Sequence, residues 1–430
     1  MPLHRSDERH AWHSFALANM DKIDQLLRVY MDVFYPTLPL FHGPTLWERV
    51  GRREYLVDHR FFASVMGVCA LAMTQPSEEA PADHPTSSGC GTQWSSNIFH
   101  AVAVDAVSRS LDKTEDFGYL QASGLLAVAA ARRGQVQSMH RYLGYFSLMS
   151  AMQHFHDEHH WPKDLSLVEK EERRCLYWSM YNLNVLGAVV FDGVMKFDES
   201  STNVEYPNQI SETGIISSAS NPEPKSDWLQ GWNFTTDMYR VLDWATKRFR
   251  SSRRDSGSKD PPSIQLLAPN QPCDAQVING VWEMYAQLSD RFTDFTARVT
   301  GDSAEDLYGF QAANIQAILQ LILMTPLLDN QEHNIDEQCD FAHELLSTFR
   351  SICPHFLTVI AYPLAHHLSG FSRRLASSTM SLSSGGYHCR VRPLLLSMGA
   401  LLKELELGCQ ISDCPSLNLF SQIEKMDHCM

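Results

Sequence analysis

The clearest absences in this sequence are those of catalytic and metal-binding motifs. The 430 residues contain no G-x-G-x-x-G, P-loop or G-x-S-x-G pattern, the motifs that cradle phosphates or expose a nucleophilic serine. The ten cysteines include no C-x-x-C pair, which excludes the usual spacing of structural zinc ligands. In a reducing compartment, we expect most of these thiols to be free and packed as small apolar groups. The sequence therefore predicts a protein that is not an enzyme and carries no cofactor or metal.

Positive charge is also scarce. Lysine and arginine number 35 against 50 aspartates and glutamates, which gives a formal net charge of -15. Because non-specific DNA binding depends on basic side chains that neutralise phosphates, any DNA contact must be local or supplied by a partner. The start MPLHRSDERH lacks the apolar run of a secretory signal peptide. No stretch approaches the roughly 20 apolar residues that span a bilayer, so we expect a soluble, intracellular protein with no membrane partner.

Long alternations of β-branched residues are missing too, and apolar residues recur instead at helical spacing. The first stripe, residues 20–34, stops before Pro36, because proline cannot extend a helix ladder. Thr45-x-x-Glu48 has the pattern of a capping box and predicts a short second helix. Further helices are expected at 59–73, 96–111, 117–132, 135–155, 166–191, 227–249, 275–298, 304–328, 335–352, 356–369 and 391–405. The pattern predicts an all-α fold, an extended array of packed helices in two connected blocks.

Composition divides the chain into four parts. Residues 1–16 are expected to form an N-terminal tail, and residues 17–207 form the first helical half. Residues 208–226 belong to a stretch rich in Ser, Asn and Pro, which predicts a connecting loop. Residues 227–430 form the second half, interrupted near 251–263 by SSRRDSGSKDPPS, a sequence with the composition of a disordered loop.

The most informative stretch is residues 165–191, LSLVEKEERRCLYWSMYNLNVLGAVVF. Ser166-x-x-Glu169 is a capping box, which satisfies orphan amide donors at a helix start. Arg173 and Arg174 follow within the first two turns, and Trp178 lies one turn further on. A charge held inside a helical array must be paired to be tolerated, and a guanidinium offers a planar fork to carboxylates on neighbouring helices. We therefore favour a structural, bridging role for the two arginines, the alternative being contact with a regulatory ligand.

Three ordered patches carry a family resemblance. They are YMDVFYP at 30–36 with LPLFH at 38–42 and PTL at 44–46, then QASGLL at 121–126 with RYLGYF at 141–146, and finally EERR at 171–174 with Trp178. In this order they resemble the fungal-specific transcription factor domain, the helical regulatory region that follows a binuclear zinc cluster in many fungal regulators. The resemblance extends over about residues 17–207 and makes Arg173, Arg174 and Trp178 its signature.

The resemblance implies a transcription regulator located in the nucleus, with a share in the cytoplasm left open, and family association suggests control of a specialised-metabolite or other pathway gene cluster. Only about 16 residues precede the first expected domain helix, which leaves no room for a zinc cluster and its linker. We therefore expect the protein to act with a partner, such as a full-length regulator, the transcription machinery or a second copy, with a small-molecule effector left open. A truncated or mis-spliced gene product is another explanation, which upstream sequence encoding six closely spaced cysteines would reveal.

Departures from the family pattern motivate a competing hypothesis. Leu46 stands where an aromatic residue is common, Asn184 where family members usually have aspartate, and Asp192-Gly193-Val194 where they have a Gly-Arg-Pro turn. Together with nine tryptophans and the missing DNA-binding module, these changes allow a helical scaffold repurposed as a small-molecule-binding protein or biosynthetic enzyme.

The densest group of metal-ligand residue types is HFHDEHH at 154–160, in which His156 and His160 would share a helical face. The spacing is not the H-E-x-x-H of a zinc protease, and histidine near a helix C-terminus is favoured by the helix dipole. We therefore interpret the group as a solvated helix end, with a metal site as the alternative.

Cys175 follows two arginines, which would suit a thiol with a lowered pKa. Its place in the apolar stripe favours a buried packing cysteine instead, and no histidine is fixed near it by the sequence. The acidic pairs Glu78-Glu79 and Glu171-Glu172 lack the aspartate-rich spacing that holds magnesium in terpene cyclases, which are also all-α.

A basic run precedes the second loop. It comprises Lys247, Arg248, Arg250, Arg253 and Arg254 and is expected to end in a flexible segment. The run is compatible with a nuclear localisation signal or a small DNA-contacting patch, the alternative being a solvated charge run.

Overall fold

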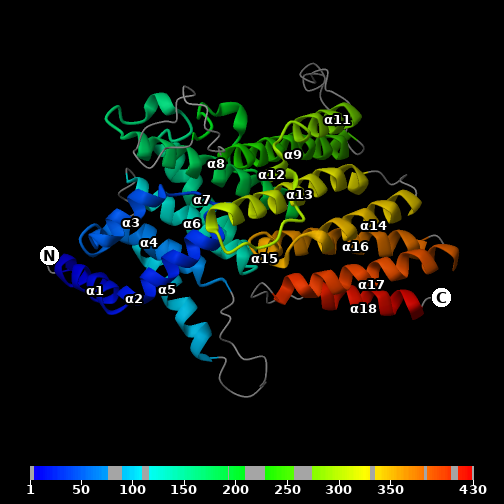
Figure 1. Ribbon diagram of the computed structural model, residues 1–430, viewed down its shortest axis with the longest axis horizontal. Coiled ribbons are helices and arrows are strands. Elements are labelled where there is room, and N and C mark those ends of the chain that lie inside the picture. The colour runs from blue at the N-terminus through cyan, green and yellow to red at the C-terminus, as the bar shows by residue number, and fades with distance from the viewer. Residues whose placement is uncertain are drawn as a thin grey trace. The chain divides into compact units, whose positions relative to one another are not determined.

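The computed structural model describes residues 4–75, 90–108, 116–191, 193–208, 228–255, 274–329, 335–381, 385–407 and 415–428. Every regular element in these ranges is a helix, and the only pairing of β type there is an isolated parallel bridge between Asp157 and Asn203 (Figure 1). The all-α prediction is therefore confirmed. The chain forms two compact units, and the described residues up to Leu229 belong to the first and those from Gln230 to the second.

The first unit contains the elements that position the signature residues. They are α1 (His4–Ala18), α2 (Met20–Val29), the π-helix η1 (Tyr30–Phe34), α3 (Gly43–Gly51), η2 (Glu54–Leu56), α4 (His59–Ala72), α5 (Cys90–Ser108), α6 (Phe117–Arg132), α7 (Val136–Met152), η3 (Glu158–His160), α8 (Leu167–Val190) and η4 (Glu199–Ser201). The helix expected at 117–132 has the predicted bounds, and the first stripe ends before Pro36 as predicted.

Two expectations for the start of the chain are wrong. Residues 1–16 are not a tail, because α1 covers most of them and the ring of Trp12 packs 5.0 Å from that of Phe62 on α4. The capping box at Thr45 is absent: α3 already begins at Gly43, with Pro44 in its first turn. The hydroxyl of Thr45 lies instead 2.8 Å from Nδ1 of His42, so the proline rather than a side-chain cap starts this helix.

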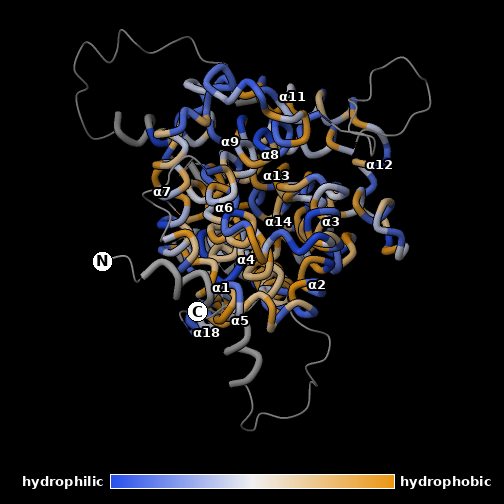
Figure 2. Tube along the Cα trace, turned by 90° about the vertical axis from the view of Figure 1, so that its left-hand side faces the viewer, coloured by the Kyte–Doolittle hydropathy of each residue, from blue (hydrophilic) through white to orange (hydrophobic). Residues whose placement is uncertain are grey.

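The core of the first unit is built on α4 and α6, which pack against each other. Every residue from Phe61 to Ala72 on α4 is buried, as expected of a helix that is apolar all round. Figure 2 shows hydrophobic stretches in orange around the α4 and α6 labels. Gly124 lets α6 approach α8 closely, because a Cβ atom there would lie only 2.9 Å from the sulfur of Met180.

The second unit contains most of α9 (Leu229–Asp255), followed by α11 (Asp274–Tyr285), α12 (Asp290–Thr293), α13 (Ser303–Asp329), α14 (Ile335–Ser351), α15 (Pro354–Leu357), α16 (Ala361–Ser381), α17 (Gly385–Leu407) and α18 (Pro415–His428). The expectation of a single helix at 275–298 is wrong, because a turn separates α11 from α12. The helix expected at 356–369 is likewise divided between α15 and a longer α16, and α18 was not predicted.

Helix α13 corrects the expectation that no stretch is long and apolar enough to cross a membrane. Ser303–Met324 meets both criteria, yet 78% of its most apolar window is buried in the protein. Phe310 on this helix packs edge to face on Phe356 of α15, with ring centres 5.1 Å apart. Burial against neighbouring helices is typical of a core helix, so packing explains the apolar composition.

Candidate functional site

The signature helix α8 begins where the sequence predicts. The hydroxyl of Ser166 accepts a hydrogen bond from the backbone N–H of Glu169 at 3.1 Å, so this half of the capping box forms. The carboxylate of Glu169 does not complete the box; it lies 3.0 Å from the guanidinium of Arg173 one turn along the helix. The start of α8 is therefore fixed by Ser166, while Glu169 belongs to the charge network.

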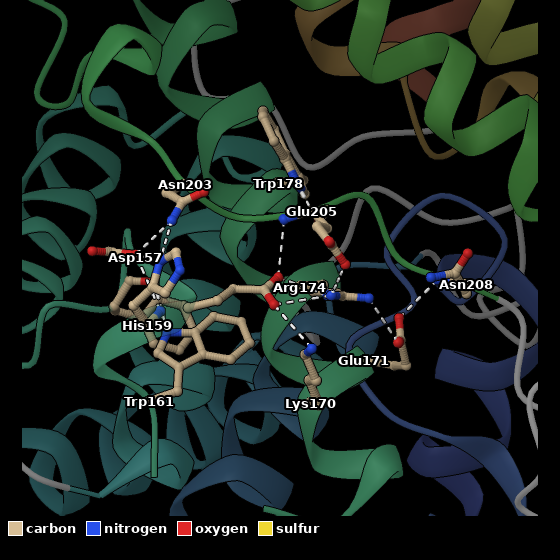
Figure 3. Close-up of polar contacts among 12 residues, drawn as sticks. Asp157, His159, Trp161, Lys170, Glu171, Arg174, Trp178, Asn203, Glu205 and Asn208 are labelled. Carbon is tan, nitrogen blue, oxygen red and sulfur yellow. Dashed lines mark hydrogen bonds and ion pairs between the residues drawn. The ribbon is translucent and has the colours of Figure 1, made fainter. Parts of the chain in front are cut away.

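Arg174 joins three separate segments of the first unit (Figure 3). Its Nε and Nη2 donate to the two oxygens of Glu158 at 2.7 and 2.9 Å, and its Nη1 donates to Glu171 at 3.0 Å. It also pairs with Glu205, whose own backbone N–H donates to Glu158 at 2.9 Å. The arginine side chain is only 4% exposed, so it ties η3 and residues 203–208 to the inner face of α8.

The partners of Arg174 are further hydrogen bonded, as buried charges must be. Lys170 lies 3.2 Å from Glu158, and Glu171 accepts from the backbone N–H of Asn208 at 2.7 Å. Burial opposes ionisation of Glu158, but the bonds from Arg174 and from the N–H of Glu205 outweigh it and lower the pKa of this carboxyl. At Glu171 burial prevails over the same kinds of bond and raises its pKa.

Trp178 lies one turn after Arg174 and contacts the same segment, residues 203–208. Its indole N–H donates to the carbonyl of Glu205 at 3.0 Å, and its ring packs edge to face on Tyr206 with centres 5.0 Å apart. Nearby, the hydroxyls of Tyr177 and Thr202 form a hydrogen bond. Within this segment, Arg174 thus binds the charged side chain of Glu205, and Trp178 packs on the ring of Tyr206.

Arg173 occupies a different environment. Its guanidinium lies 4.7 Å from the ring centre of Phe117 and within 5.8 Å of Phe155 and Trp161, a distance typical of cation–π contacts. Burial lowers the pKa of Arg173, and the bond to Glu169 opposes that shift. Its Nε is buried without a hydrogen-bond partner among the described residues. Arg173 therefore acts mainly as a packed cation over aromatic rings.

The histidine-rich segment is not the helix end that the sequence suggests. Helix α7 stops at Met152, and His154 adopts a left-handed φ of 51°. The change of direction buries Phe155, which stacks on Trp161 at 5.6 Å. His156 and His160 consequently share no helical face.

Two histidines of this segment contact an acid. Nδ1 of His159 and of His160 lie 3.0 and 2.9 Å from the two carboxylate oxygens of Asp157. No group of three or more His, Cys, Asp or Glu side chains in the described part of the chain is placed to hold a metal ion.

Cys175 is buried on α8. Burial, with further contributions from Glu171 and Glu172, raises the pKa of its thiol well above the usual value. The effect is opposite to the lowered pKa that a nucleophilic thiolate requires. Cys175 is therefore a packing residue, in line with the interpretation favoured from the sequence.

Asn184, which replaces the usual aspartate, uses both ends of its amide. The oxygen accepts from the backbone N–H of Lys196 at 2.8 Å, and the nitrogen donates to the carbonyl of Phe197 at 3.2 Å. An ionised aspartate has no donor for that carbonyl.

In the altered turn, Asp192 lies outside the described residues. The N–H of Gly193 donates to the carbonyl of Gly187 at 3.3 Å, and Val194 is exposed.

The basic run lies on a helix rather than in a flexible segment. Helix α9 continues to Asp255, so Lys247, Arg248, Arg250, Arg253 and Arg254 are all helical. Lysine and arginine are good helix formers, and no glycine or proline interrupts the run before Gly257. Lys247 lies 3.0 Å from Asp243, and the Arg248 guanidinium lies 5.4 Å from the ring centre of Trp244. Residues 256–263 of the expected disordered loop lie outside the described residues.

Sequence reasoning missed a second group of residues beside the arginine network. Glu172 turns away from Arg174, and its Oε1 accepts the backbone N–H of His42 at 2.7 Å. Burial raises the pKa of Glu172 to about 7, although the His42 bond opposes the shift. The sequence shows Glu171 and Glu172 as adjacent acids, and only the helical period indicates that they face different neighbours.

The part of the chain that contains α8 and residues 203–208 matches a known protein family. A model of the fungal specific transcription factor domain matches residues 27–267, more than half of the chain. The chain belongs to this family. The fungal specific transcription factor domain is a regulatory domain rather than an enzyme family, so membership indicates a fungal transcription regulator and in general implies a nuclear protein. No curated protein and no solved structure matches the chain.

Proposed function

We propose that the protein regulates transcription of a pathway gene set, such as a specialised-metabolite cluster, as the helical regulatory part of a DNA-bound assembly. The observation that carries the proposal is the family match over residues 27–267, within which lie Arg173, Arg174 and Trp178. The buried charge network of these residues gives the domain a fixed surface on which a partner can assemble. The pathway itself is inferred from family association.

A protein partner supplies the DNA reading in this proposal. The 430 residues contain none of the closely spaced cysteines that hold a binuclear zinc cluster. Their net charge of -15 also disfavours broad attraction to phosphates. A full-length regulator of the same family, the transcription machinery or a second copy of the chain is the partner we propose.

Chromatin immunoprecipitation tests this function. Tagged protein is expected to enrich promoters of its target genes only when the DNA-reading partner is present, and enrichment should disappear in a strain that lacks the partner. Absence of promoter enrichment under every partner condition would exclude the regulatory proposal.

Nuclear import by the basic residues of α9 is a separate part of the proposal. Changing Lys247, Arg248, Arg250, Arg253 and Arg254 to alanine in a fluorescent fusion should reduce nuclear accumulation. A matched control changes the exposed Lys403 and Lys425, which are distant in sequence. Unchanged nuclear accumulation of the five-residue variant would refute the nuclear localisation signal and would not bear on the regulatory role.

The second candidate function is that of a small-molecule-binding protein or biosynthetic enzyme on the same scaffold. A partly aromatic cavity beside Glu172 favours it. Deleting the gene and profiling transcripts beside metabolites separates the two functions. Pathway transcripts fall if the protein is a regulator, whereas an intermediate accumulates at normal transcript levels if it is an enzyme.

A further inference from the structure

A cavity of about 200 Å³ lies in the first unit beside the start of α8. Tyr35, Phe41 and Trp228 contribute aromatic walls, and Val168, Glu172 and Cys175 line it from α8. The rings of Tyr35 and Trp228 lie 5.6 Å apart and are tilted by 47°, so they form one continuous apolar corner. Mostly apolar cavities with a few convergent polar groups are the usual form of a ligand site, and this one is smaller than most.

Glu172 is the acidic group of this cavity with unused hydrogen-bonding capacity. Its carboxylate accepts one hydrogen bond, from the N–H of His42, and makes no other with the described residues. The neighbouring Glu171 differs, because Arg174 and the N–H of Asn208 already bind its two oxygens. The hydroxyl of Tyr35 likewise makes no hydrogen bond with the described part of the chain.

The charge on the lining of the cavity favours a cation, while Arg49 and Arg173 act on Glu172 from outside the lining. No lysine or arginine is among its described lining residues, and burial lowers the pKa of His42, the basic side chain that does line it. A carboxylate with a free oxygen forms strong, charge-assisted bonds with an ammonium group. Aromatic faces attract the same group through their quadrupoles.

The cavity volume sets the size of the occupant. A protein cavity of about 150 Å³ holds benzene, so one of about 200 Å³ holds a molecule of roughly eight to ten non-hydrogen atoms. We infer that the cavity binds a small organic amine, whose ammonium group donates to Glu172 and whose apolar body lies against Tyr35, Phe41 and Trp228. The inference goes beyond the regulatory role and does not depend on it.

The position of the site gives the ligand a structural effect. Glu172 and Val168 belong to α8, whereas Tyr35 and Phe41 precede α3 and Trp228 precedes α9. A bound amine therefore links three segments far apart in the sequence. Because it binds the folded state alone, it raises the unfolding temperature, and the rise continues with the logarithm of the free amine concentration once that exceeds the dissociation constant.

Calorimetric titration of the full chain with two probes of equal size tests the inference. Phenethylamine carries an ammonium group, and 2-phenylethanol replaces that group with a neutral hydroxyl. At pH 8 both Glu172 and the amine are charged, and we expect the amine to bind at least tenfold more tightly than the alcohol. Equal affinities, or no binding of either probe, would overturn the inference.

Two variants and one control locate the binding. Glu172→Gln should abolish the preference for the amine, and Val168→Trp should block both probes by filling the cavity. Glu48→Gln, at an exposed position outside the cavity, should bind like the original chain. An unchanged preference in Glu172→Gln would place the amine elsewhere and refute the site, and circular dichroism establishes that each variant is folded.

Discussion

The guanidinium of Arg174 holds both carboxylate oxygens of Glu158, at 2.7 and 2.9 Å, across 16 positions of the chain. The two parallel bonds fix the orientation of each side chain as well as the distance between them. Because the Arg174 side chain is 4% exposed and that of Glu158 is 13% exposed, solvent screens the pair only slightly. The pair therefore fixes the η3 turn against α8.

Arg174→Met is expected to destabilise the first unit by about 3 to 5 kcal/mol, because it removes the cation that contacts Glu171 and leaves Glu158 with Lys170 alone. Urea unfolding followed by circular dichroism measures the change. Arg52→Met is a suitable control, since Arg52 is 66% exposed and its bond to Glu48 contributes about 1 kcal/mol or less. Equal losses in the two variants would show that Arg174 has no special role.

Asn184→Asp should cost about 1 to 3 kcal/mol of stability, even though it restores the residue usual in the family. The new carboxylate cannot donate to the carbonyl of Phe197, which then faces an acceptor instead of a donor. Gln287→Glu makes the same amide-to-acid change at an exposed position and should leave the unfolding midpoint almost unaltered. A stable Asn184→Asp variant would mean that residues 196–197 rearrange around the acid.

Glu172 should make the protein less stable as the pH rises from about 4.5 to about 7. Burial raises its pKa from 4.5 to about 7, so within this window the folded chain retains a proton that the unfolded chain has lost. Glu172→Gln removes the effect, and at pH 8 we expect this variant to gain roughly 3 kcal/mol relative to its difference at pH 4. Urea titrations at the two pH values measure the gain; the same difference at both would contradict the raised pKa.

The cysteines should react with iodoacetamide in a fixed order. Cys389 is exposed, whereas Cys69 and Cys175 are buried and burial raises the pKa of both thiols. We expect Cys389 to be alkylated in the native protein and the two buried thiols only after unfolding, as followed by mass spectrometry of peptides. Rapid native labelling of Cys175 would argue for a reactive thiol after all.

Helix positions were predictable where apolar spacing alone determines them. Helix α6 has the predicted bounds because Asp116 and Gly134 flank a largely apolar stretch without proline. The failures lie where tertiary contacts override local pattern. Helix α7 ends early so that Phe155 can stack on Trp161, and α1 forms where few apolar residues signal it, because Trp12 packs on Phe62.

Only the arginines of the charge network were predictable from the sequence, and their acidic partners were not. The sequence identifies Arg173 and Arg174 as charges that need partners, but their partners come from other segments. Glu158 lies in a region that the sequence presents as histidine-rich, and Glu205 lies in a Ser- and Asn-rich stretch beyond the helix. No spacing rule connects positions separated by 16 and 31 residues.

The π-helical turn at Tyr30–Phe34 holds one residue more than an α-helical turn would need, as the bond from the N–H of Tyr35 to the carbonyl of Tyr30 at 2.8 Å shows. Removing a single residue there would convert the i→i+5 bond into an ordinary i→i+4 bond and leave the residues on either side of the turn on nearly the same helix faces, because the wide turn takes up the extra residue. The turn is thus the place where an insertion or deletion can be absorbed without breaking the helix. When relatives of this chain are aligned, a one-residue gap belongs there rather than in the loop after Pro36.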